Sequence, residues 1–135
     1  MKNILFVCVE NACRSQMAEA FANKYSKEKV NAFSAGSKPA DKINPVTIEV
    51  LEEKGLKIKT VRPKGFEYFK DKKIDLVVSM GCGDVCPFVP ADKHLHWDIE
   101  NPRGKEKEVF RRVRDEIEEK VKNLIQEIIK DNSSS

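Results

Sequence analysis

The chain has 135 residues, a length typical of one domain and sufficient to bury a hydrophobic core. Hydrophobic residues make up 40% of it and charged residues 35%, which excludes an intrinsically disordered protein. The net charge of +3, from 25 Lys and Arg against 22 Asp and Glu, is too small to indicate a nucleic-acid partner. The apolar runs are far shorter than the roughly 18 residues of a membrane span, so we expect a cytoplasmic protein with no membrane partner. We expect one domain at residues 1–131, followed by a polar tail at residues 132–135.

Short apolar runs alternate with amphipathic stretches along the chain. The runs are rich in β-branched and aromatic residues, which predicts buried strands at residues 3–7, 31–35, 74–80 and 94–97. Apolar residues repeated every three or four positions predict helices at residues 15–26, 45–54, 65–73 and 105–130. Asn44 is a favoured helix cap, and Pro45 suits a first helical position. Strands that alternate with helices predict an α/β fold, a three-layer sandwich with a central four-stranded parallel sheet flanked by helices.

The four cysteines form two pairs that are far apart in the sequence, Cys8 with Cys13 and Cys82 with Cys86. Cytoplasmic thiols stay reduced, so such pairs indicate redox chemistry, catalysis or a metal site. Cys8 ends the first predicted strand, and Cys82 follows the third. In a parallel sheet the working crevice lies beyond the carboxyl ends of the strands. The topology therefore allows both pairs to face one crevice.

The stretch C-V-E-N-A-C-R-S at residues 8–15 joins the first strand to the first helix. A sharp turn there leaves backbone N–H groups without carbonyl partners, and the helix N-terminus adds more, so the turn can cradle a tetrahedral oxyanion. Arg14 provides a planar fork that matches two oxygens of such an anion. The same positive field favours the thiolate form of Cys8, to which Ser15 can donate a hydrogen bond. The arrangement predicts a covalent site for phosphate-like anions; a buried Cys8 beside a surface Arg14 is the simpler alternative.

The longer pattern V-C-x-x-N-x-C-R-S-Q-M-A-E at residues 7–19 closely resembles the phosphate-binding loop of the thioredoxin-coupled arsenate reductases, which share the low-molecular-weight tyrosine phosphatase fold. The resemblance continues through SAGSKPADKINPVTIEVLEEKG, IDLVVSMGCGD, HWDIENP and FRRVRDEI, so it covers almost the whole chain. It implies a low-molecular-weight-phosphatase-like fold and an arsenate-reducing oxidoreductase that acts in arsenic detoxification.

The resemblance also implies a role for individual residues of the loop. Cys8 corresponds to the nucleophile, Arg14 to the main oxyanion ligand, and Ser15 to the partner of the thiolate. Asn11 corresponds to the residue that shapes the loop. The residues that surround the oxyanion, arsenate or phosphate, are then Glu10, Asn11, Ala12, Cys13, Arg14 and Ser15.

The implied mechanism uses two further cysteines. Cys8 attacks arsenate, and Cys82 then attacks Cys8, which releases arsenite and leaves a disulfide between the two. Cys86 attacks Cys82 and moves the disulfide to the surface, where a thioredoxin-like partner reduces it. A phosphatase needs one cysteine and water, so the second pair separates the two chemistries through thiol–disulfide exchange.

No tightly bound cofactor and no metal are expected. The resemblance implies that Glu19, with Asn11 and Ser34, helps to hold the loop and can bind a monovalent cation. A zinc site that joins the second cysteine pair to His94 and His96 is a less favoured alternative.

Two features depart from the family pattern. The second cysteine pair has a C-x3-C spacing, which is shorter than the family's. Cys86 therefore either completes the relay with a smaller movement or only tunes Cys82. Asn101 stands where relatives have the aspartate of an Asp-Pro pair, and an amide cannot protonate a leaving oxygen. Asp98 and Glu100 are the replacement acids to test, Glu100 first. We therefore expect weak phosphomonoesterase activity.

Other interpretations stay open. Cys13 is expected to be a small buried residue rather than a redox thiol. A low-molecular-weight protein tyrosine phosphatase would use Cys8, Arg14 and an aspartate. A non-catalytic oxyanion or redox sensor would bind phosphate or arsenate and report through the second cysteine pair.

Overall fold

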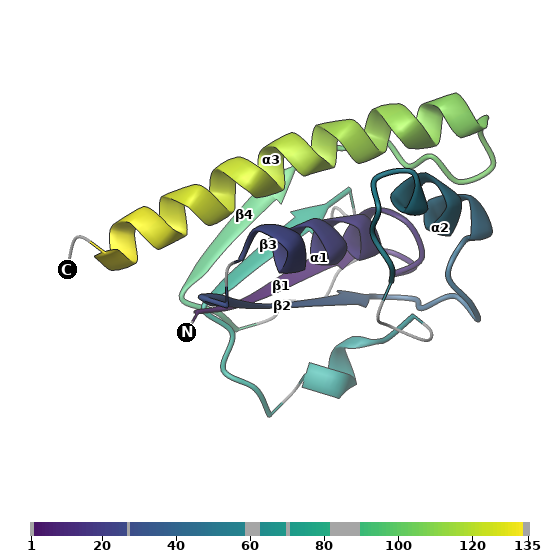
Figure 1. The fold of residues 1–135 in the computed structure, drawn as a ribbon. Coiled ribbons are helices and arrows are strands. Elements are labelled where there is room, and N and C mark those ends of the chain that lie inside the picture. Colours follow the sequence, from purple (N-terminus) through teal and green to yellow (C-terminus); the bar gives the residue numbers. More distant parts are fainter. Residues whose placement is uncertain (1, 27, 59–62, 70, 82–89, 134–135) are drawn as a thin grey trace.

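The computed structural model describes residues 2–26, 28–58, 63–69, 71–81 and 90–133 of the chain (Figure 1). Its strands form one sheet in the order β2-β1-β3-β4, and every neighbouring pair is parallel. The strands are β1 (Lys2–Cys8), β2 (Val30–Gly36), β3 (Leu76–Met80) and β4 (Lys93–Trp97). The predicted four-stranded parallel sheet is confirmed.

The register aligns the carboxyl ends of the strands at one end of the sheet, towards the right-hand side of Figure 1. The paired residues nearest that end are Cys8 with Gly36, Val7 with Ser79, and Met80 with Trp97. This is the end at which a doubly covered parallel sheet places its functional crevice. The first predicted strand therefore delivers Cys8 to the expected position.

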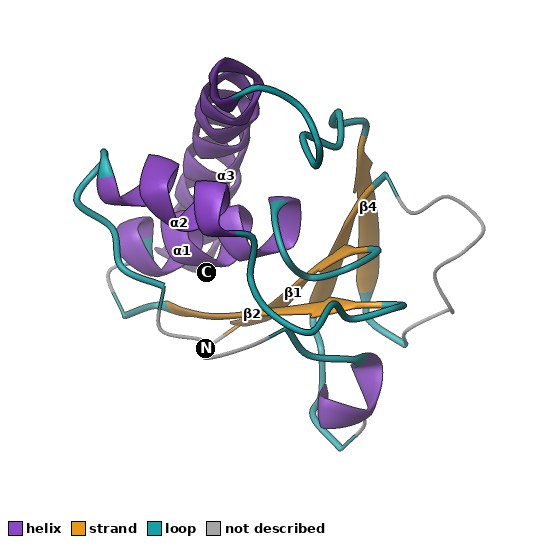
Figure 2. Ribbon diagram, turned by 90° about the vertical axis from the view of Figure 1, so that its right-hand side faces the viewer, coloured by secondary structure: helices purple, strands orange, loops and turns teal. Residues whose placement is uncertain are grey.

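Three helices cover one face of the sheet, as Figure 2 shows. They are α1 (Arg14–Tyr25), α2 (Pro45–Glu52) and α3 (Lys107–Ser133). Ile4 and Phe6 of β1 face these helices and belong to one core with Met17, Phe21 and Phe110. All five side chains are buried, so the apolar stripes of α1 and α3 are anchored on the central strand.

The opposite face of the sheet carries a smaller core. Leu5 and Val7, which alternate with the residues of the first core, pack there with Phe69. β1 is apolar throughout because both of its faces are buried. The helix predicted at 65–73 is too long: the structure has a single 3₁₀ turn, η1 (Phe66–Phe69). Its first and last residues are the two that pack on the sheet, and one 3₁₀ turn is enough to place both.

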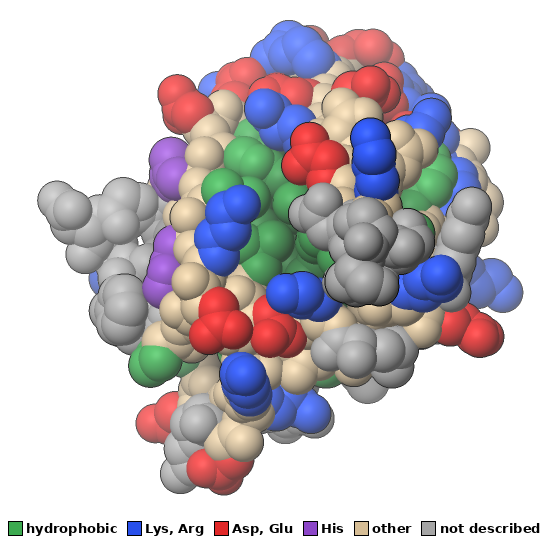
Figure 3. Space-filling model, turned by 90° about the vertical axis from the view of Figure 1, so that its left-hand side faces the viewer, with side chains coloured by type: hydrophobic (Ala, Val, Ile, Leu, Met, Phe, Trp, Pro, Cys, Tyr) green, Lys and Arg blue, Asp and Glu red, His purple; other side chains and the backbone are tan. Residues whose placement is uncertain are grey.

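The ends of the other helices largely follow the sequence signals. The Oδ1 of Asn44 accepts the N–H of Val46 at 2.9 Å, with Pro45 in the first helical position, so the predicted start of α2 is confirmed. α3 extends to Ser133, beyond the predicted end at residue 130. In the described ranges no helix is long and apolar enough to cross a membrane. On the face shown in Figure 3, Lys and Arg are interspersed with Asp and Glu around a group of hydrophobic side chains, in keeping with the small net charge.

Candidate active site

The loop of residues 9–13 joins the end of β1 to the start of α1. Cys8, the last residue of β1, is 2% exposed, and its Sγ lies 2.9 Å from the Oγ of Ser15 in the first turn of α1. The Nδ2 of Asn11 donates to the same Ser15 oxygen at 2.7 Å. Because an amide nitrogen can only donate, the hydroxyl proton of Ser15 stays available for the Cys8 sulfur. The predicted nucleophile is thus in contact with its predicted hydrogen-bond donor.

The segment after β2 occupies the carbonyl groups of the loop. Its backbone amides donate to them as follows: Lys38 to Val9 at 2.8 Å, Ala40 to Glu10 at 3.0 Å, and Asn44 to Ala12 at 3.2 Å. Within the described residues, no hydrogen bond joins the amide N–H groups of residues 9–13 to a protein acceptor. Cys13 holds the cap position of α1, and its side chain makes no capping hydrogen bond. Available amides beside an uncapped helix start match the anion cradle that the sequence predicts.

Asn11 holds the shape of this loop. Its backbone has a φ of +53°, a left-handed conformation that asparagine tolerates better than most residues. Its buried Oδ1 accepts the Nε2 of Gln16 at 3.0 Å and the backbone N–H of Lys64 at 2.8 Å. The geometry agrees with the loop-shaping role implied for Asn11. Gln16 and Lys64 were not identified from the sequence as parts of the site.

Arg14 is 4% exposed and lies beside the loop. Its Nη1 donates to the carbonyl of Ile99 at 2.9 Å. Its Nε is buried and has no hydrogen-bond partner in the described part of the chain. A buried guanidinium N–H needs an acceptor, and an oxyanion oxygen would supply one. The alternative in which Arg14 is a surface charge is therefore wrong.

Two glycines that the sequence analysis did not assign to the site make room for it. A Cβ on Gly36 would lie 2.6 Å from the carbonyl oxygen of Val9, so a side chain there would push the loop away. Gly81 has a φ of +75°, and a Cβ there would lie 2.0 Å from the Nη1 of Arg14. Gly36 is the last residue of β2, and Gly81 directly follows β3. A glycine at the end of a strand indicates that another backbone or side chain approaches closely.

The side chains of Ala12 and Cys13 pack into the larger core rather than towards the site. Burial raises the pKa of the Cys13 thiol. A protonated, buried thiol is a poor nucleophile, which agrees with the interpretation of Cys13 as a small buried residue. The backbone amides are then what these two residues can offer to an anion.

The segment after β4 carries the candidate acids. The carboxylate of Glu100 pairs with the ammonium of Lys105 and, at 2.7 Å, with the Nη2 of Arg112. These hydrogen bonds, that from Lys105 first, lower the pKa of Glu100. Glu100 is therefore held as a carboxylate and is a poor proton donor, against the expectation that it is the first candidate. Asp98, exposed directly after β4, is the better candidate of the two.

The same segment is tied to the loop at two points. The carbonyl of Ile99 accepts the bond from Arg14, and the Nη1 of Arg103 lies 2.6 Å from the Oε1 of Glu10. The Oδ1 of Asn101 accepts the N–H of Arg103 at 3.1 Å, so Asn101 stabilises the turn between these points. The side chain of Glu10 is engaged in this ion pair, which leaves its amide as the group that can face an anion.

The relay residues Cys82 and Cys86, which are also two of the four ligands of the alternative zinc site, lie outside the described residues. Of the two histidine ligands, His96 has its Nδ1 3.0 Å from the Oγ of Ser79. In the residues that the structure does describe, no group of three or more His, Cys, Asp or Glu side chains is arranged to hold a metal ion.

The sequence profile of one family, low molecular weight phosphotyrosine protein phosphatase, matches residues 3–134. The chain belongs to this family. Its relatives within the family include the glutaredoxin arsenate reductase of Synechocystis sp., which is 38% identical over 131 residues, 95% of this chain and 99% of that protein.

Solved structures of arsenate reductases share the fold of the chain. An arsenate reductase in the phosphate binding state is 37% identical, with a TM-score of 0.84 over 95% of this chain and 99% of that one. The thioredoxin-dependent arsenate reductase of Corynebacterium glutamicum is 36% identical, with a TM-score of 0.78 over 95% of this chain and 62% of that one. The predicted fold and the resemblance to arsenate reductases are confirmed.

Proposed function

We propose that this protein is an arsenate reductase that uses Cys8 as its nucleophile. One observation carries the proposal: the buried Cys8 thiol contacts Ser15 beside a buried Arg14 whose Nε has no acceptor among the described residues. A tetrahedral oxyanion supplies that acceptor, and its central atom then lies beside the sulfur. The arsenate reductases among the relatives support the choice of arsenate, and the similar arsenate reductase in the phosphate binding state supports an oxyanion ligand.

The chemistry balances with two thiols. The Cys8 thiolate first forms a bond to arsenic, and one arsenate oxygen leaves as water after protonation. The Cys82 thiolate then attacks the Cys8 sulfur, so that an S–S bond forms and the S–As bond breaks. The electron pair of the broken bond stays on arsenic, which becomes As(III) and leaves as arsenite. The role of Cys82 in this scheme rests on the resemblance.

Regeneration requires an external dithiol. In the proposed scheme Cys86 takes over the disulfide with Cys82, and a thioredoxin-like protein reduces it. An internal disulfide is the substrate of a dithiol reductant, whereas a single remaining thiol would form a mixed disulfide with glutathione. The relatives include both a glutaredoxin arsenate reductase and a thioredoxin-dependent one, so the reductant must be tested directly.

The test is arsenate-dependent oxidation of NADPH by the purified protein. It is run once with thioredoxin and thioredoxin reductase, and once with glutaredoxin, glutathione and glutathione reductase. We expect turnover with thioredoxin that stops in Cys8→Ser and in Cys82→Ser. Cys8→Ser should still bind inorganic phosphate, because the loop and Arg14 are unchanged. Arsenate turnover in Cys8→Ser would refute the assigned nucleophile, and phosphate ester hydrolysis without arsenate turnover under either regime would make the protein a phosphatase.

A further inference from the structure

Gln16, in the first turn of α1, is not among the residues assigned to the chemistry. Its side chain is 1% exposed, and its Nε2 donates to two oxygens of Asn11, the backbone carbonyl at 3.0 Å and the Oδ1 at 3.0 Å. Both acceptors are carbonyl oxygens, so the nitrogen end of the Gln16 amide must face them. One buried side chain therefore holds both the main chain and the side chain of Asn11.

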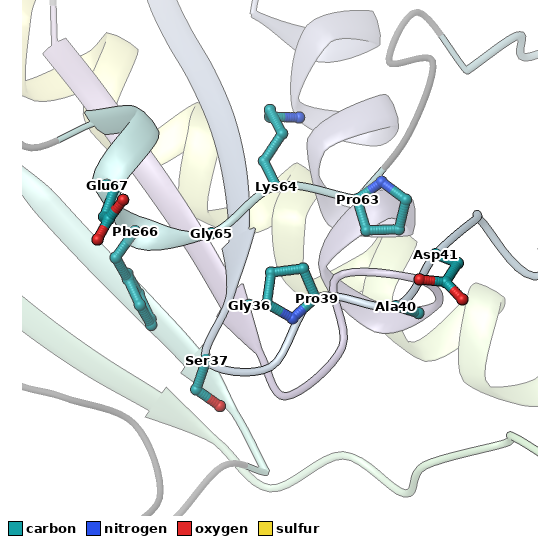
Figure 4. Close-up of a pocket in the computed structure, with 10 residues that line it drawn as sticks. All are labelled: Gly36, Ser37, Pro39, Ala40, Asp41, Pro63, Lys64, Gly65, Phe66 and Glu67. Atoms are coloured by element: carbon teal, nitrogen blue, oxygen red, sulfur yellow. The ribbon is translucent and has the colours of Figure 1, made fainter.

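A backbone donor fixes which way the Asn11 amide points. The Oδ1 of Asn11 also accepts the N–H of Lys64 at 2.8 Å, and a backbone N–H can only donate. Lys64 is itself anchored, because its carbonyl accepts the N–H of Gly36 at 2.8 Å where the two segments lie side by side (Figure 4). The oxygen of the Asn11 amide is thereby occupied, so its Nδ2 is left to face Ser15, to which it donates at 2.7 Å.

The hydrogen bonds form a chain with one direction, which ends at the nucleophile. Gln16 donates to Asn11, Asn11 donates to the Oγ of Ser15, and the Ser15 proton is left for the Cys8 sulfur 2.9 Å away. Each bond in such a chain polarises the next, so the first donor strengthens the last bond. A hydrogen bond to a thiolate favours the ionised form over the thiol.

The other end of the Gln16 amide has an energetic cost. Its Oε1 is buried and has no hydrogen-bond partner in the described ranges of the chain. A buried acceptor without a donor lowers stability, and a methionine of the same length would avoid this cost. The two bonds to Asn11 are therefore what a glutamine provides at this position and an apolar side chain does not.

We propose that Gln16 is a positioning residue, which holds Asn11 in the orientation that directs the Ser15 hydroxyl at Cys8. Its bond to the Asn11 carbonyl also restrains a backbone that has a φ of +53°. The inference deepens the proposed function, because it concerns the same nucleophile. Its readout is the alkylation of Cys8, which needs no arsenate turnover, so its failure is distinguishable from a failure of the arsenate assay.

Gln16→Met removes both donated bonds and keeps the length of the side chain. Alkylation of Cys8 by iodoacetamide is followed by peptide mass spectrometry in a pH series from about 5 to about 9.5. We expect the rate to fall by about threefold or more at the acidic end, and to converge with wild type at the alkaline end, where a free thiol is ionised in any case. Asn23→Met is the matched control: it removes an exposed amide two helical turns further along the same face of α1, and should keep the rate within about twofold.

A double variant separates the hydrogen-bond chain from packing. In a Ser15→Ala background the chain no longer reaches the sulfur, so adding Gln16→Met should slow alkylation by less than about twofold further. The proposal is overturned by an undiminished loss in that background, by equal slowing at every pH, or by a Gln16→Met variant that matches Asn23→Met. If Gln16→Met does not fold, Gln16→Asn, whose amide is one methylene shorter, is carried through the same series with the same expected results.

Discussion

The Nη1 of Arg103 lies 2.6 Å from the Oε1 of Glu10, so an ion pair joins the segment after β4 to the oxyanion loop. Without Arg103, Glu10 would present an uncompensated negative charge beside an anion site. We expect Arg103→Gln to raise the KM for arsenate up to about fivefold, because exposed ion pairs contribute about 0.2–1 kcal/mol. Steady-state kinetics at low ionic strength measure the change, which should shrink as salt screens the charge.

A double variant provides the control for this ion pair. Glu10→Gln in the Arg103→Gln background removes the uncompensated charge, so the KM should return close to the wild-type value. A KM that stays high in the double variant would mean that Arg103 contacts the substrate itself or fixes the loop by other bonds.

Gly81 sets the position of Arg14. Gly81→Ala places a methyl group 2.0 Å from the Nη1 of Arg14, so the guanidinium must move. Hydrogen bonds to charged groups contribute about 1.5–3 kcal/mol, and we therefore expect the affinity for inorganic phosphate to fall at least about tenfold. Gly104→Ala is a close control: its φ is +78° against +75°, but no atom of the described residues, other than its own and those of its two chain neighbours, lies within 4 Å of the added Cβ. An equal loss of affinity in both variants would attribute the effect to backbone strain instead of Arg14.

Ser15 is expected to stabilise the Cys8 thiolate. Ser15→Ala removes the hydroxyl that lies 2.9 Å from the sulfur, so alkylation of Cys8 by iodoacetamide at pH 7 should slow by about tenfold or more. Peptide mass spectrometry separates Cys8 from Cys13, whose buried thiol has a raised pKa and should stay unmodified in the native protein. Phosphate should protect Cys8. An unchanged alkylation rate would show that the contact is structural.

The acid that protonates a leaving group can be identified with esters that need it, such as phenyl phosphate. Glu100→Gln should change their hydrolysis by less than twofold, because Lys105 and Arg112 already hold Glu100 as a carboxylate. Asp98→Asn should lower the residual rate by about tenfold, and Asn101→Asp should raise it, since general acids contribute roughly 10²–10⁴-fold. A larger loss in Glu100→Gln than in Asp98→Asn would return the role to Glu100.

The sheet and the loop follow from local features of the sequence. The apolar run before Cys8 predicts a strand buried on both faces, and the two cores on either side of β1 confirm it. The spacing from Cys8 to Arg14 predicts an anion loop at a strand-to-helix turn, and the uncapped start of α1 agrees with that prediction. Such features can be predicted from the sequence because each depends on residues that are close together in the chain.

The features that the sequence analysis missed depend on distant residues. The carbonyl of Ile99 binds Arg14 across 85 positions, and the backbone of Lys64 binds Asn11 across 53. A main-chain partner leaves no signature in side-chain type, so neither contact could be inferred from motif spacing. The pairing of Glu100 with Arg112, which argues against Glu100 as the acid, could not be inferred for a related reason, because it appears only when α3 is folded onto the sheet.

Glu53, just after the end of α2, pairs with two arginines of α3. The Nη2 of Arg111 lies 2.8 Å and the Nη1 of Arg114 2.7 Å from its carboxylate oxygens. The hydrogen bonds from Arg111 and then Arg114 lower the pKa of Glu53 from 4.5 to about 2. Because the folded-state pKa lies below that of the unfolded chain, the carboxylate stabilises the fold above about pH 4.5, and this contribution is lost as the pH falls towards 2.

Glu53→Gln should therefore lower the Tm at pH 7, and its difference from wild type should close as the pH falls from about 4.5 to about 2. Added salt should reduce the difference at pH 7, because the carboxylate is partly exposed. Glu52→Gln removes a neighbouring exposed carboxylate for which the described residues show no ion pair, so its Tm should follow wild type at every pH. A Tm deficit in Glu53→Gln that is constant with pH would mean that the Glu53 side chain stabilises the fold by packing. A contribution from its charge would disappear once the carboxylate is protonated.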